Sequence, residues 1–375
     1  MKKRPISAIS VAETKQPNWL VSMPSSDVTN VISNFMRTNV GEEMRKQKTK
    51  ELRAELQKTK PKTNSRGYHY ELFDEETIVK YKNRTSVIRV SCNSNLLSQA
   101  DVATIKVFDY ILYKAAERAV LTETDDDSDR KMEFPARDVM ELFGYTDRHS
   151  IVQAFTKAFR ILDSMKLVIG NKEQNNGDDI YIEGGAMPPL FTWCDVEYGK
   201  CKVYFNPDIP WRRIMTGFFF LPAFYFRLSQ REALFLRHLA YRARMAGEDI
   251  GKSKDRSFVV RIDTISDVLQ LPNPANTKNP GRDIKGVIDR CLETIETTQK
   301  DLKVPDSQWI KFEYVGLTEN NAAKMDDFLN QVKLKVILGS DIAEPYIEIA
   351  ENKNKHVAAE IKKKRGRPPK NKQPD

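Results

Sequence analysis

The chain has 375 residues, of which 40% are hydrophobic and 30% are charged, and its formal net charge is +9. This length is enough for two or three domains, each with a hydrophobic core of its own. No stretch approaches the roughly 18–20 apolar residues that span a bilayer, and no apolar segment follows the basic start of the chain. The composition argues against a membrane protein and predicts a cytoplasmic one.

The positive charge is concentrated at the two ends of the chain. Residues 1–63 contain thirteen Lys/Arg against six Asp/Glu, and residues 353–375 contain nine against two. Each end therefore carries +7, which leaves about −5 for the residues between them. Because solvated tails alone can make a protein basic, the net charge does not show that the folded core binds nucleic acid. That conclusion has to come from the pattern of elements.

Residues 1–85 are predicted to form an N-terminal extension that is partly disordered. They mix Ser, Thr, Asn and Lys with a charged helix at 42–58, which Pro61 ends. An apolar cluster at 19–36 has helical spacing in its second half, which indicates a short amphipathic element. The cluster can dock on the folded domain or on a partner.

Residues 86–210 have the pattern of a first compact unit. A strand at 87–90 is followed by a long amphipathic helix, for which Ser98 is the expected N-cap. A strand follows at 131–134, then a helix at 137–143 that ends at Gly144, and then a second helix at 147–165. The strands at 166–170 and 180–182, joined by an Asn-Gly turn, are predicted to form a two-stranded ribbon. Further strands at 191–196 and 202–205 complete the unit.

Residues 211–340 repeat this order. Leu228-Ser229-Gln230 matches Leu97-Ser98-Gln99 and opens a helix that continues to about residue 246. A strand at 258–261 and a short helix at 264–271 follow. After a Pro/Asn-rich turn comes a longer helix at 281–300, and strands at 309–315 and 333–338 end the unit. The repeated order predicts an internal duplication.

A short helix, a tight turn, a second helix and a strand pair make up the winged form of the helix-turn-helix. The second helix fits the major groove, and the wing lies along the neighbouring backbone. Winged domains also bind proteins, so the topology alone leaves that alternative open. The predicted fold class is α+β, with two tandem winged-helix domains and flexible basic extensions at both ends.

The residues around the start of each second helix are of types that read DNA. Arg binds guanine and Asn or Gln binds adenine in bidentate fashion, and Lys or Arg binds phosphate. The candidates in the first unit are Thr146, Arg148, His149, Ser150, Gln153, Lys157 and Arg160, and those in the second are Asn276, Thr277, Lys278, Asn279, Arg282 and Lys285.

Residues 341–375 are predicted to form a basic tail with an AT-hook. The core of this motif is Arg365-Gly366-Arg367-Pro368, with lysines on both sides. Glycine lets the backbone lie on the floor of a narrow minor groove, and the two arginines insert along an A·T tract. The lysines add salt-dependent attraction to phosphates.

The chain lacks the motifs of the common enzyme classes. The cysteines (Cys92, Cys194, Cys201 and Cys291) are scattered, and the four histidines are too far apart to indicate a metal site. Gly247–Ser253 resembles a phosphate-binding loop but has three residues between its glycines instead of four, and it follows a helix. The sequence predicts a non-enzyme without cofactor or metal, and it argues against a nicking initiator, which needs clustered histidines.

A resemblance to a known family rests on the repeated order of elements, on the two Leu-Ser-Gln segments and on the stretch from Phe134-Pro135-Ala136 to Leu167. Over about residues 86–338 the chain resembles the theta-type plasmid replication initiators. The resemblance implies binding to repeated origin sequences, opening of an A·T-rich tract and recruitment of a host initiator and the replicative helicase. It also implies that the helix near Arg282 is the principal reader and that the helix near Arg148 contacts mainly the DNA backbone. Members often repress their own promoter as homodimers, through contacts of the first unit.

Two other functions remain open at this stage. A transcriptional regulator can use the same DNA-binding parts, and a structural or partition protein can use the basic tails to bind DNA without sequence preference. Directly repeated sites beside the gene favour the initiator, a single palindrome favours the regulator, and equal affinity for all DNA favours the third function. All three place the protein in a bacterial cytoplasm, on the nucleoid or on a plasmid.

Overall fold

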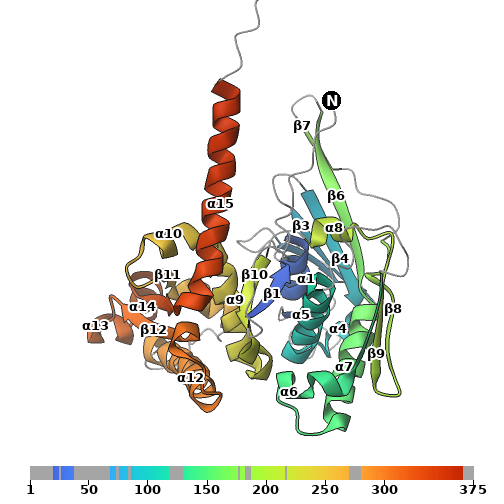
Figure 1. The fold of residues 1–375 in the computed structure, drawn as a ribbon, viewed down its shortest axis with the longest axis horizontal. Coiled ribbons are helices and arrows are strands. Elements are labelled where there is room, and N and C mark those ends of the chain that lie inside the picture. Colours follow the sequence, from blue (N-terminus) through green and yellow to red (C-terminus); the bar gives the residue numbers. More distant parts are fainter. Residues whose placement is uncertain are drawn as a thin grey trace, which may run out of the picture. The chain divides into compact units, whose positions relative to one another are not determined.

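The computed structural model shows a mixed α+β chain with two compact units (Figure 1). The first unit lies within residues 1–218 and 223–233, and the second within 219–222 and 234–375. None of the helices in the described part of the chain is long and apolar enough to cross a membrane. The structure describes residues 20–24, 27–37, 68–72, 76–82, 86–117, 130–175, 178–181, 187–215, 218–269 and 280–365.

A five-stranded antiparallel sheet forms one part of the first unit. Its order is β2-β3-β4-β6-β7, so the predicted strand at 87–90 lies in its centre as β4. Two of its strands come from the segment that the sequence assigned to the N-terminal extension, which also supplies β1 (Leu20–Pro24) and α1 (Asp27–Arg37). The helix predicted at 42–58 lies outside the described residues. The sheet strands are β2 (Tyr68–Leu72), β3 (Glu76–Lys82), β4 (Ser86–Asn93), β6 (Lys166–Asn175) and β7 (Asp178–Tyr181).

The rest of the first unit is a group of helices with a second, three-stranded antiparallel sheet. This sheet has the order β5-β9-β8. Its strands are β5 (Lys131–Pro135), β8 (Phe191–Glu197) and β9 (Lys200–Phe205). The helices are α4 (Ser94–Leu97), α5 (Val102–Glu117), η3 (Ala136–Val139), α6 (Met140–Phe143), α7 (Arg148–Asp163), α8 (Trp211–Ile214) and η4 (Ala223–Arg227).

The hairpin predicted between the strands at 166–170 and 180–182 is confirmed, but it is not a separate two-stranded ribbon. Its strands are β6 and β7, and β6 pairs with β4 and so belongs to the five-stranded sheet. The ribbon that joins the strand between the helices is β8–β9, because β9 pairs with β5 over the whole length of β5. An Asn-Gly turn predicts a hairpin correctly, but it does not tell which sheet the hairpin joins.

Ser98 is not the N-cap of the long helix. It follows the short helix α4, and its hydroxyl donates to the backbone oxygen of Asn95 at 2.7 Å. Helix α5 begins at Val102, where Asp101 Oδ1 accepts from the backbone N–H of Thr104 at 3.0 Å. In the second unit Gln230 is itself the first residue of α9. The two Leu-Ser-Gln segments therefore do not occupy equivalent positions.

A cluster of five aromatic rings forms the core around α7. Tyr110 of α5 lies at its centre, with ring centroids 5.3–6.3 Å from the other four rings, which come from β5, α6, α7 and η4. The edge-to-face geometry of these pairs is favourable beyond simple burial. One cluster thus fixes five elements against each other. The four partners of Tyr110 are Phe134, Phe143, Phe155 and Phe226.

Two buried polar side chains of α5 hold the segment that leads into α9. Lys106 donates to the backbone oxygens of Phe226 and Leu228, the first at 3.0 Å. Asp109 accepts from the hydroxyl of Tyr225 at 2.7 Å. Burial lowers the pKa of the Lys106 ammonium to about 8, because a charged group loses its hydration in the core.

The second unit repeats the order of helix, strand, short helix, helix and strand pair. Its three-stranded sheet has the order β11-β13-β12, so the strand between the helices again pairs with the last strand of the hairpin, as β5 pairs with β9. The elements are β10 (Phe218–Pro222), α9 (Gln230–Met245), α10 (Gly247–Lys252), β11 (Ser257–Arg261), α11 (Ile262–Leu269), α12 (Pro280–Asp301), η5 (Asp306–Gln308), β12 (Ile310–Val315), α13 (Glu319–Ala323), α14 (Met325–Gln331), β13 (Lys333–Leu338) and α15 (Ser340–Arg365).

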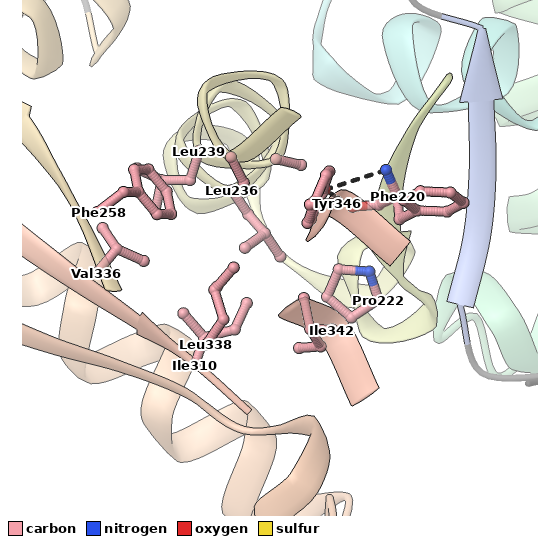
Figure 2. A pocket seen from close by; sticks show the side chains of 12 residues that line it. Phe220, Pro222, Leu236, Leu239, Phe258, Ile310, Val336, Leu338, Ile342 and Tyr346 are labelled. Atoms are coloured by element: carbon pink, nitrogen blue, oxygen red, sulfur yellow. Dashed lines mark hydrogen bonds between the residues drawn. The ribbon is translucent and has the colours of Figure 1, made fainter. Parts of the chain in front are cut away.

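Helix α15 occupies most of the segment that the sequence assigned to the basic tail, and its C-terminal half continues beyond the elements on which it packs (Figure 1). Its first turns close an apolar core that contains a gap of only about 10 Å³. In Figure 2, Tyr346 points to Phe220, whose backbone N–H donates to the Tyr346 hydroxyl at 3.1 Å. The same hydroxyl donates back to the oxygen of Phe220 at 2.7 Å.

The segment that resembles a phosphate-binding loop is the helix α10, packed on α15. A Cβ atom at Gly247 would lie 2.4 Å from the backbone oxygen of Tyr346, and one at Gly251 would lie 3.3 Å from a methyl group of Ile347. The two glycines are four residues apart and so lie on one face of the helix. They serve close helix packing, which agrees with the sequence-based rejection of a nucleotide site.

We expect Tyr346→Phe to loosen α15. The replacement removes both hydrogen bonds to Phe220 while keeping the ring, and loss of buried hydrogen bonds costs about 1–3 kcal/mol. Hydrogen exchange followed by mass spectrometry should show faster exchange in peptides from 340–353, with peptides from α7 unchanged. Equal exchange in the two proteins would show that the hydrogen bonds do not anchor the helix.

Candidate nucleic-acid interface

Helix α7 begins with a complete cap. Asp147 Oδ1 accepts from the backbone N–H of Ser150 at 2.8 Å, and Asp147 Oδ2 accepts from its hydroxyl at 2.7 Å. The preceding helix ends at Gly144, which has a φ of +70° and allows the tight turn between the two helices. Ser150 thus donates to the N-cap Asp147, while Thr146 lies exposed in the turn.

The outward face of α7 is polar. His149, Gln153 and Arg160 are all exposed and lie on the same side of the helix, at spacings of four and seven residues. Gln153 Nε2 is 2.7 Å from His149 Nε2, so the two side chains support each other. Arg160 forms no ion pair with a described residue. The opposite face packs Ile151, Phe155, Ala158, Phe159, Ile161 and Leu162 into the core.

Lys157 lies on the flank of the helix, where it forms an ion pair with Asp101 at the start of α5. Burial alone would raise the pKa of the Asp101 carboxyl, but hydrogen bonds from Lys157 and Thr104, with the charge of Lys157, outweigh burial and lower it. Lys157 therefore connects α7 to α5. The sequence predicted it as a DNA contact and did not indicate this structural role.

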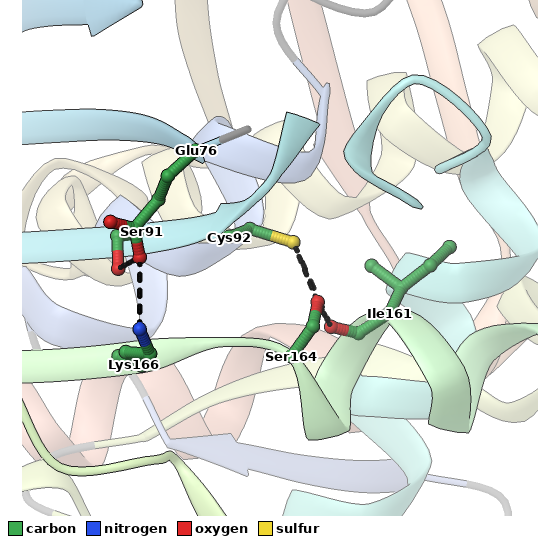
Figure 3. Close-up of polar contacts among 6 residues, drawn as sticks. All are labelled: Glu76, Ser91, Cys92, Ile161, Ser164 and Lys166. Atoms are coloured by element: carbon green, nitrogen blue, oxygen red, sulfur yellow. Dashed lines mark hydrogen bonds and ion pairs between the residues drawn. The ribbon is translucent and has the colours of Figure 1, made fainter. Parts of the chain in front are cut away.

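The C-terminal end of α7 is attached to the five-stranded sheet (Figure 3). Ser164 lies directly after α7, and its hydroxyl donates to the backbone oxygen of Ile161 at 2.8 Å and lies 3.0 Å from the sulfur of Cys92 on β4. Two residues later, Lys166 donates to Glu76 on β3 at 3.2 Å, and Ser91 on β4 donates to the same carboxylate at 2.8 Å. With the Lys157 pair, these contacts fix both the flank and the end of α7.

The tip of the β8–β9 hairpin carries an exposed aromatic ring. Tyr198 is 89% exposed and has a φ of +50°, and Gly199 has a φ of +77°. Two consecutive positive φ angles between paired strands define a type I′ turn, which favours Asn-Gly and is strained for a bulky first residue. The chain thus places a large ring at a position that costs backbone strain and gains little burial.

Arg148, the first residue of α7, lies against this tip. Its Nη2 donates to the backbone oxygen of Tyr198 at 2.9 Å. A Cβ atom at Gly199 would lie 2.3 Å from the same nitrogen, so a larger residue there would displace the guanidinium from its present position. Arg148 therefore joins the helix start and the hairpin tip into one surface, which we call the α7–tip surface: Arg148, His149, Gln153, Arg160 and Tyr198.

The outer face of the three-stranded sheet is nearly neutral, because its charges are paired across the strands. Lys200 pairs with Glu133 at 2.8 Å, and Lys202 pairs with Glu197. Lys131 lies 5.1 Å from the ring centroid of Tyr204 in a cation–π contact. This face therefore presents less free positive charge than its lysines suggest.

In the second unit, the candidates on α12 differ in how free they are. Arg282 is exposed and forms no ion pair with a described residue. Lys285 pairs with Asp289 at 2.6 Å and lies 5.1 Å from the ring centroid of Tyr314. The hydroxyl of Tyr314 donates to Asp289 at 2.9 Å, which completes a closed network. The other four candidates, Asn276, Thr277, Lys278 and Asn279, lie outside the described residues.

The hairpin of the second unit has no simple turn at its end. Its connection from β12 to β13 folds into α13 and α14, which pack on α12 and α11. A Cβ atom at Gly281 would lie 2.5 Å from the backbone oxygen of Ala322, so this connection covers one side of the first turn of α12. The two units therefore share the order of helix, strand, short helix, helix and strand pair. They differ in the connection within the strand pair, which is a short turn between β8 and β9 and a pair of helices between β12 and β13.

The described residues contain no group of three or more His, Cys, Asp or Glu side chains that could hold a metal ion. All four cysteines are buried and free of disulfides. Burial raises the pKa of Cys92 to about 11 and that of Cys201 to about 12, so these thiols stay protonated and unreactive. In the tail motif, Arg365 is the last residue of α15, while Gly366, Arg367 and Pro368 lie outside the described residues.

The sequence analysis did not find Tyr198 and Gly199 as candidate residues. The signal was present, because Tyr-Gly separates two stretches of alternating pattern and a glycine second in a two-residue turn indicates a tight hairpin. The stronger Asn-Gly signal at 176–177 attracted the ribbon assignment instead.

We expect Asp101→Asn to destabilise the protein by about 1 kcal/mol near pH 7, the order of a partly exposed ion pair. Asn keeps the oxygen that caps α5 and removes only the charge that binds Lys157. Because the pKa of Asp101 is lowered in the folded state, the wild-type advantage is present above the unfolded value near 3.8 and is lost as the pH falls below it.

Thermal unfolding at pH 7, 5 and 3.5 checks this expectation. The difference between wild type and variant should be the same at pH 7 and 5 and smaller at pH 3.5. A difference that stays constant down to pH 3.5 would show that the charge of Asp101 does not contribute.

No protein-family model and no curated protein matches this chain. Two crystal structures of domains 2 and 3 of RctB are similar to it, one of them of selenomethionine derivatives. The selenomethionine structure has 12% sequence identity and a TM-score of 0.39, covering 72% of this chain and 93% of its own. The other has 10% identity and a TM-score of 0.36, covering 76% and 96%. With identities and TM-scores this low, the function has to be argued from the residues themselves.

Proposed function

We propose that the chain is a sequence-specific binder of double-stranded DNA, built from two winged-helix units. The observation that carries this proposal is the α7–tip surface, where Arg148 joins the exposed ring of Tyr198 to the start of a helix whose outward face is polar and includes Arg160, which forms no ion pair with a described residue. Helix-turn-helix order and a hairpin that pairs with the strand between the helices support the winged-helix assignment in both units.

In this proposal α7 enters the major groove with its outward face. Gln153 and Arg160 have side chains that bind adenine and guanine in bidentate fashion, and His149 supports Gln153. Arg148 and Tyr198 then meet the sugar-phosphate backbone beside the groove, Arg148 through a phosphate and Tyr198 through its ring. Because Arg148 is already held against the hairpin, it loses little conformational freedom on binding.

The second unit contributes α12 in the same manner, through Arg282 and the preceding residues Asn276, Thr277, Lys278 and Asn279. The tail with Arg365, Gly366, Arg367 and Pro368 adds minor-groove binding to A·T-rich DNA. Two units and a tail within one chain bind cooperatively, because each bound part raises the local concentration of the others at the DNA.

We propose further that the DNA target is a set of repeated origin sequences and that the protein initiates replication there. This step rests on the resemblance of residues 86–338 to theta-type plasmid initiators, with opening of an A·T-rich tract and recruitment of a host initiator and helicase as its consequences. A winged-helix transcriptional regulator is the second candidate function, since the α7–tip surface serves it equally well. In both cases the protein is not an enzyme and needs no cofactor.

A footprint across the gene of this protein and its flanking DNA tests the proposed target. We expect evenly spaced protection over direct repeats, and we expect Arg160→Ala to weaken it through loss of a base contact. A single protected palindrome would favour the regulator. Protection of the same strength on every fragment would contradict sequence-specific binding.

We expect Tyr198→Asn to lower DNA affinity about tenfold, which corresponds to about 1.4 kcal/mol. Asn suits the first position of a type I′ turn better than Tyr, so the fold should be as stable as the wild type or slightly more stable. Fluorescence anisotropy with a labelled duplex measures the affinity, and thermal unfolding measures the stability.

The matched control for this variant is Met245→Asn. It removes another exposed apolar side chain, at the end of α9, away from the α7–tip residues in the chain. The control should bind as the wild type does. If Tyr198→Asn also binds as the wild type does, the hairpin tip is not part of the DNA interface.

A further inference from the structure

Helix α12 contains a glycine that the surrounding chain does not explain. Gly286 lies in the second turn of this long helix, and glycine is the poorest helix former after proline. Apart from its chain neighbours and the backbone of α12 itself, no heavy atom of a described residue lies within 4 Å of a Cβ atom built on Gly286. Alanine would therefore fit without any clash and would favour the helix.

Other glycines of the second unit have a clear reason. Cβ atoms at Gly247 and Gly281 would lie 2.4 Å and 2.5 Å from backbone oxygens, and one at Gly339 would lie 2.3 Å from the backbone oxygen of Ser307. At these positions the packing of the chain itself requires glycine. At Gly286 no described residue of the chain fills the space that a side chain would take, so the helix surface there is open to a close approach by a partner.

The side chains around Gly286 indicate what that molecule is. Arg282 and Arg290 lie one turn before and one turn after it, on the same exposed face. Neither forms an ion pair with a described residue, whereas the nearby Lys285 is held by Asp289. Two exposed carboxylates lie on the same side of the helix, Asp283 three residues before Gly286 and Glu293 beyond Arg290, so the positive charge is confined to the two arginines that flank the glycine. Two free guanidinium groups on either side of a bare stretch of backbone suit a single anionic group.

We propose that Gly286 is a point of closest approach between α12 and duplex DNA, where a phosphodiester group lies over the glycine between Arg282 and Arg290. The missing side chain lets the DNA backbone reach the helix surface, and the two arginines bind the phosphate and its neighbours from either side. The inference rests on the proposed function, and it assigns to α12 a backbone contact that the sequence-based candidates did not include.

Two replacements at position 286 distinguish the loss of this DNA contact from a loss of folding. Gly286→Ala should raise the melting temperature slightly, because alanine favours the helix, and should lower DNA affinity several-fold. Gly286→Leu should lower it at least 50-fold with the fold intact, because its larger side chain fills the space of the phosphate. Thr297→Leu is the matched control, since Thr297 is exposed on the same face beyond Glu293 and should bind DNA as the wild type does.

Anisotropy titrations of the full chain, on its footprinted site and on an unrelated duplex over a range of salt concentrations, give the readout. A phosphate contact predicts the same fold-loss on both duplexes, and it predicts that Arg290→Ala reduces the slope of log affinity against log salt by about 1. A loss confined to the specific site would place a base over Gly286 and overturn the phosphate assignment.

If Gly286→Leu folds stably and binds DNA with the affinity of the wild type, the inference about Gly286 is wrong. The proposed function then still stands as long as the wild-type chain gives its footprint. A wild-type chain that binds neither duplex overturns both.

Discussion

The aromatic cluster around Tyr110 is the interaction on which the first unit depends. Its rings come from α5, β5, α6, α7 and η4, so a single packed group sets the angle between α6 and α7 and the position of β5, which precedes them. Because β5 pairs with β9, the same cluster also places the β8–β9 hairpin beside α7. The α7–tip surface is a consequence of this core, since the helix has to turn its polar side outward once its aromatic side is buried.

The two units use one topology with different exposed ends. In the first, a two-residue turn leaves Tyr198 in solvent and next to Arg148. In the second, α13 and α14 fill the same place in the chain and cover one side of the start of α12 near Gly281. In the proposed complex, the second unit therefore has no free hairpin tip for the DNA, and its contact is assigned to the face of α12 on which Arg282, Gly286 and Arg290 lie.

Local signals in the sequence predicted most helices and strands, but not the pairing of the strands. The stop at Gly144 and the amphipathic pattern of α7 depend on neighbouring residues, so both were predicted correctly. The ribbon was assigned to the wrong hairpin because an Asn-Gly turn reports only its own two strands, whereas sheet membership depends on β4 and β5, which are distant in sequence. The Leu-Ser-Gln match indicated a real repeat through residues that are not equivalent. Lys157 and Lys285 were predicted to contact DNA because lysine is a residue type that binds phosphate. The sequence alone could not show that each of them forms an ion pair with an aspartate.

The state of these charges bears on the choice between specific and non-specific DNA binding. Seven lysines of the described residues, Lys157, Lys166, Lys200, Lys202, Lys252, Lys285 and Lys335, form ion pairs within the chain. Arg160, Arg282 and Arg290 form none with a described residue. A non-specific binder gains affinity from many mobile cations, whereas a reader of sequence needs a few planar groups in fixed places. The described units thus pair many of their lysines with carboxylates and leave these three arginines without an ion pair to a described residue, while the formal positive charge of the sequence is concentrated at its two ends. Such a division suits units that select the site and ends that add salt-dependent affinity once the site is bound.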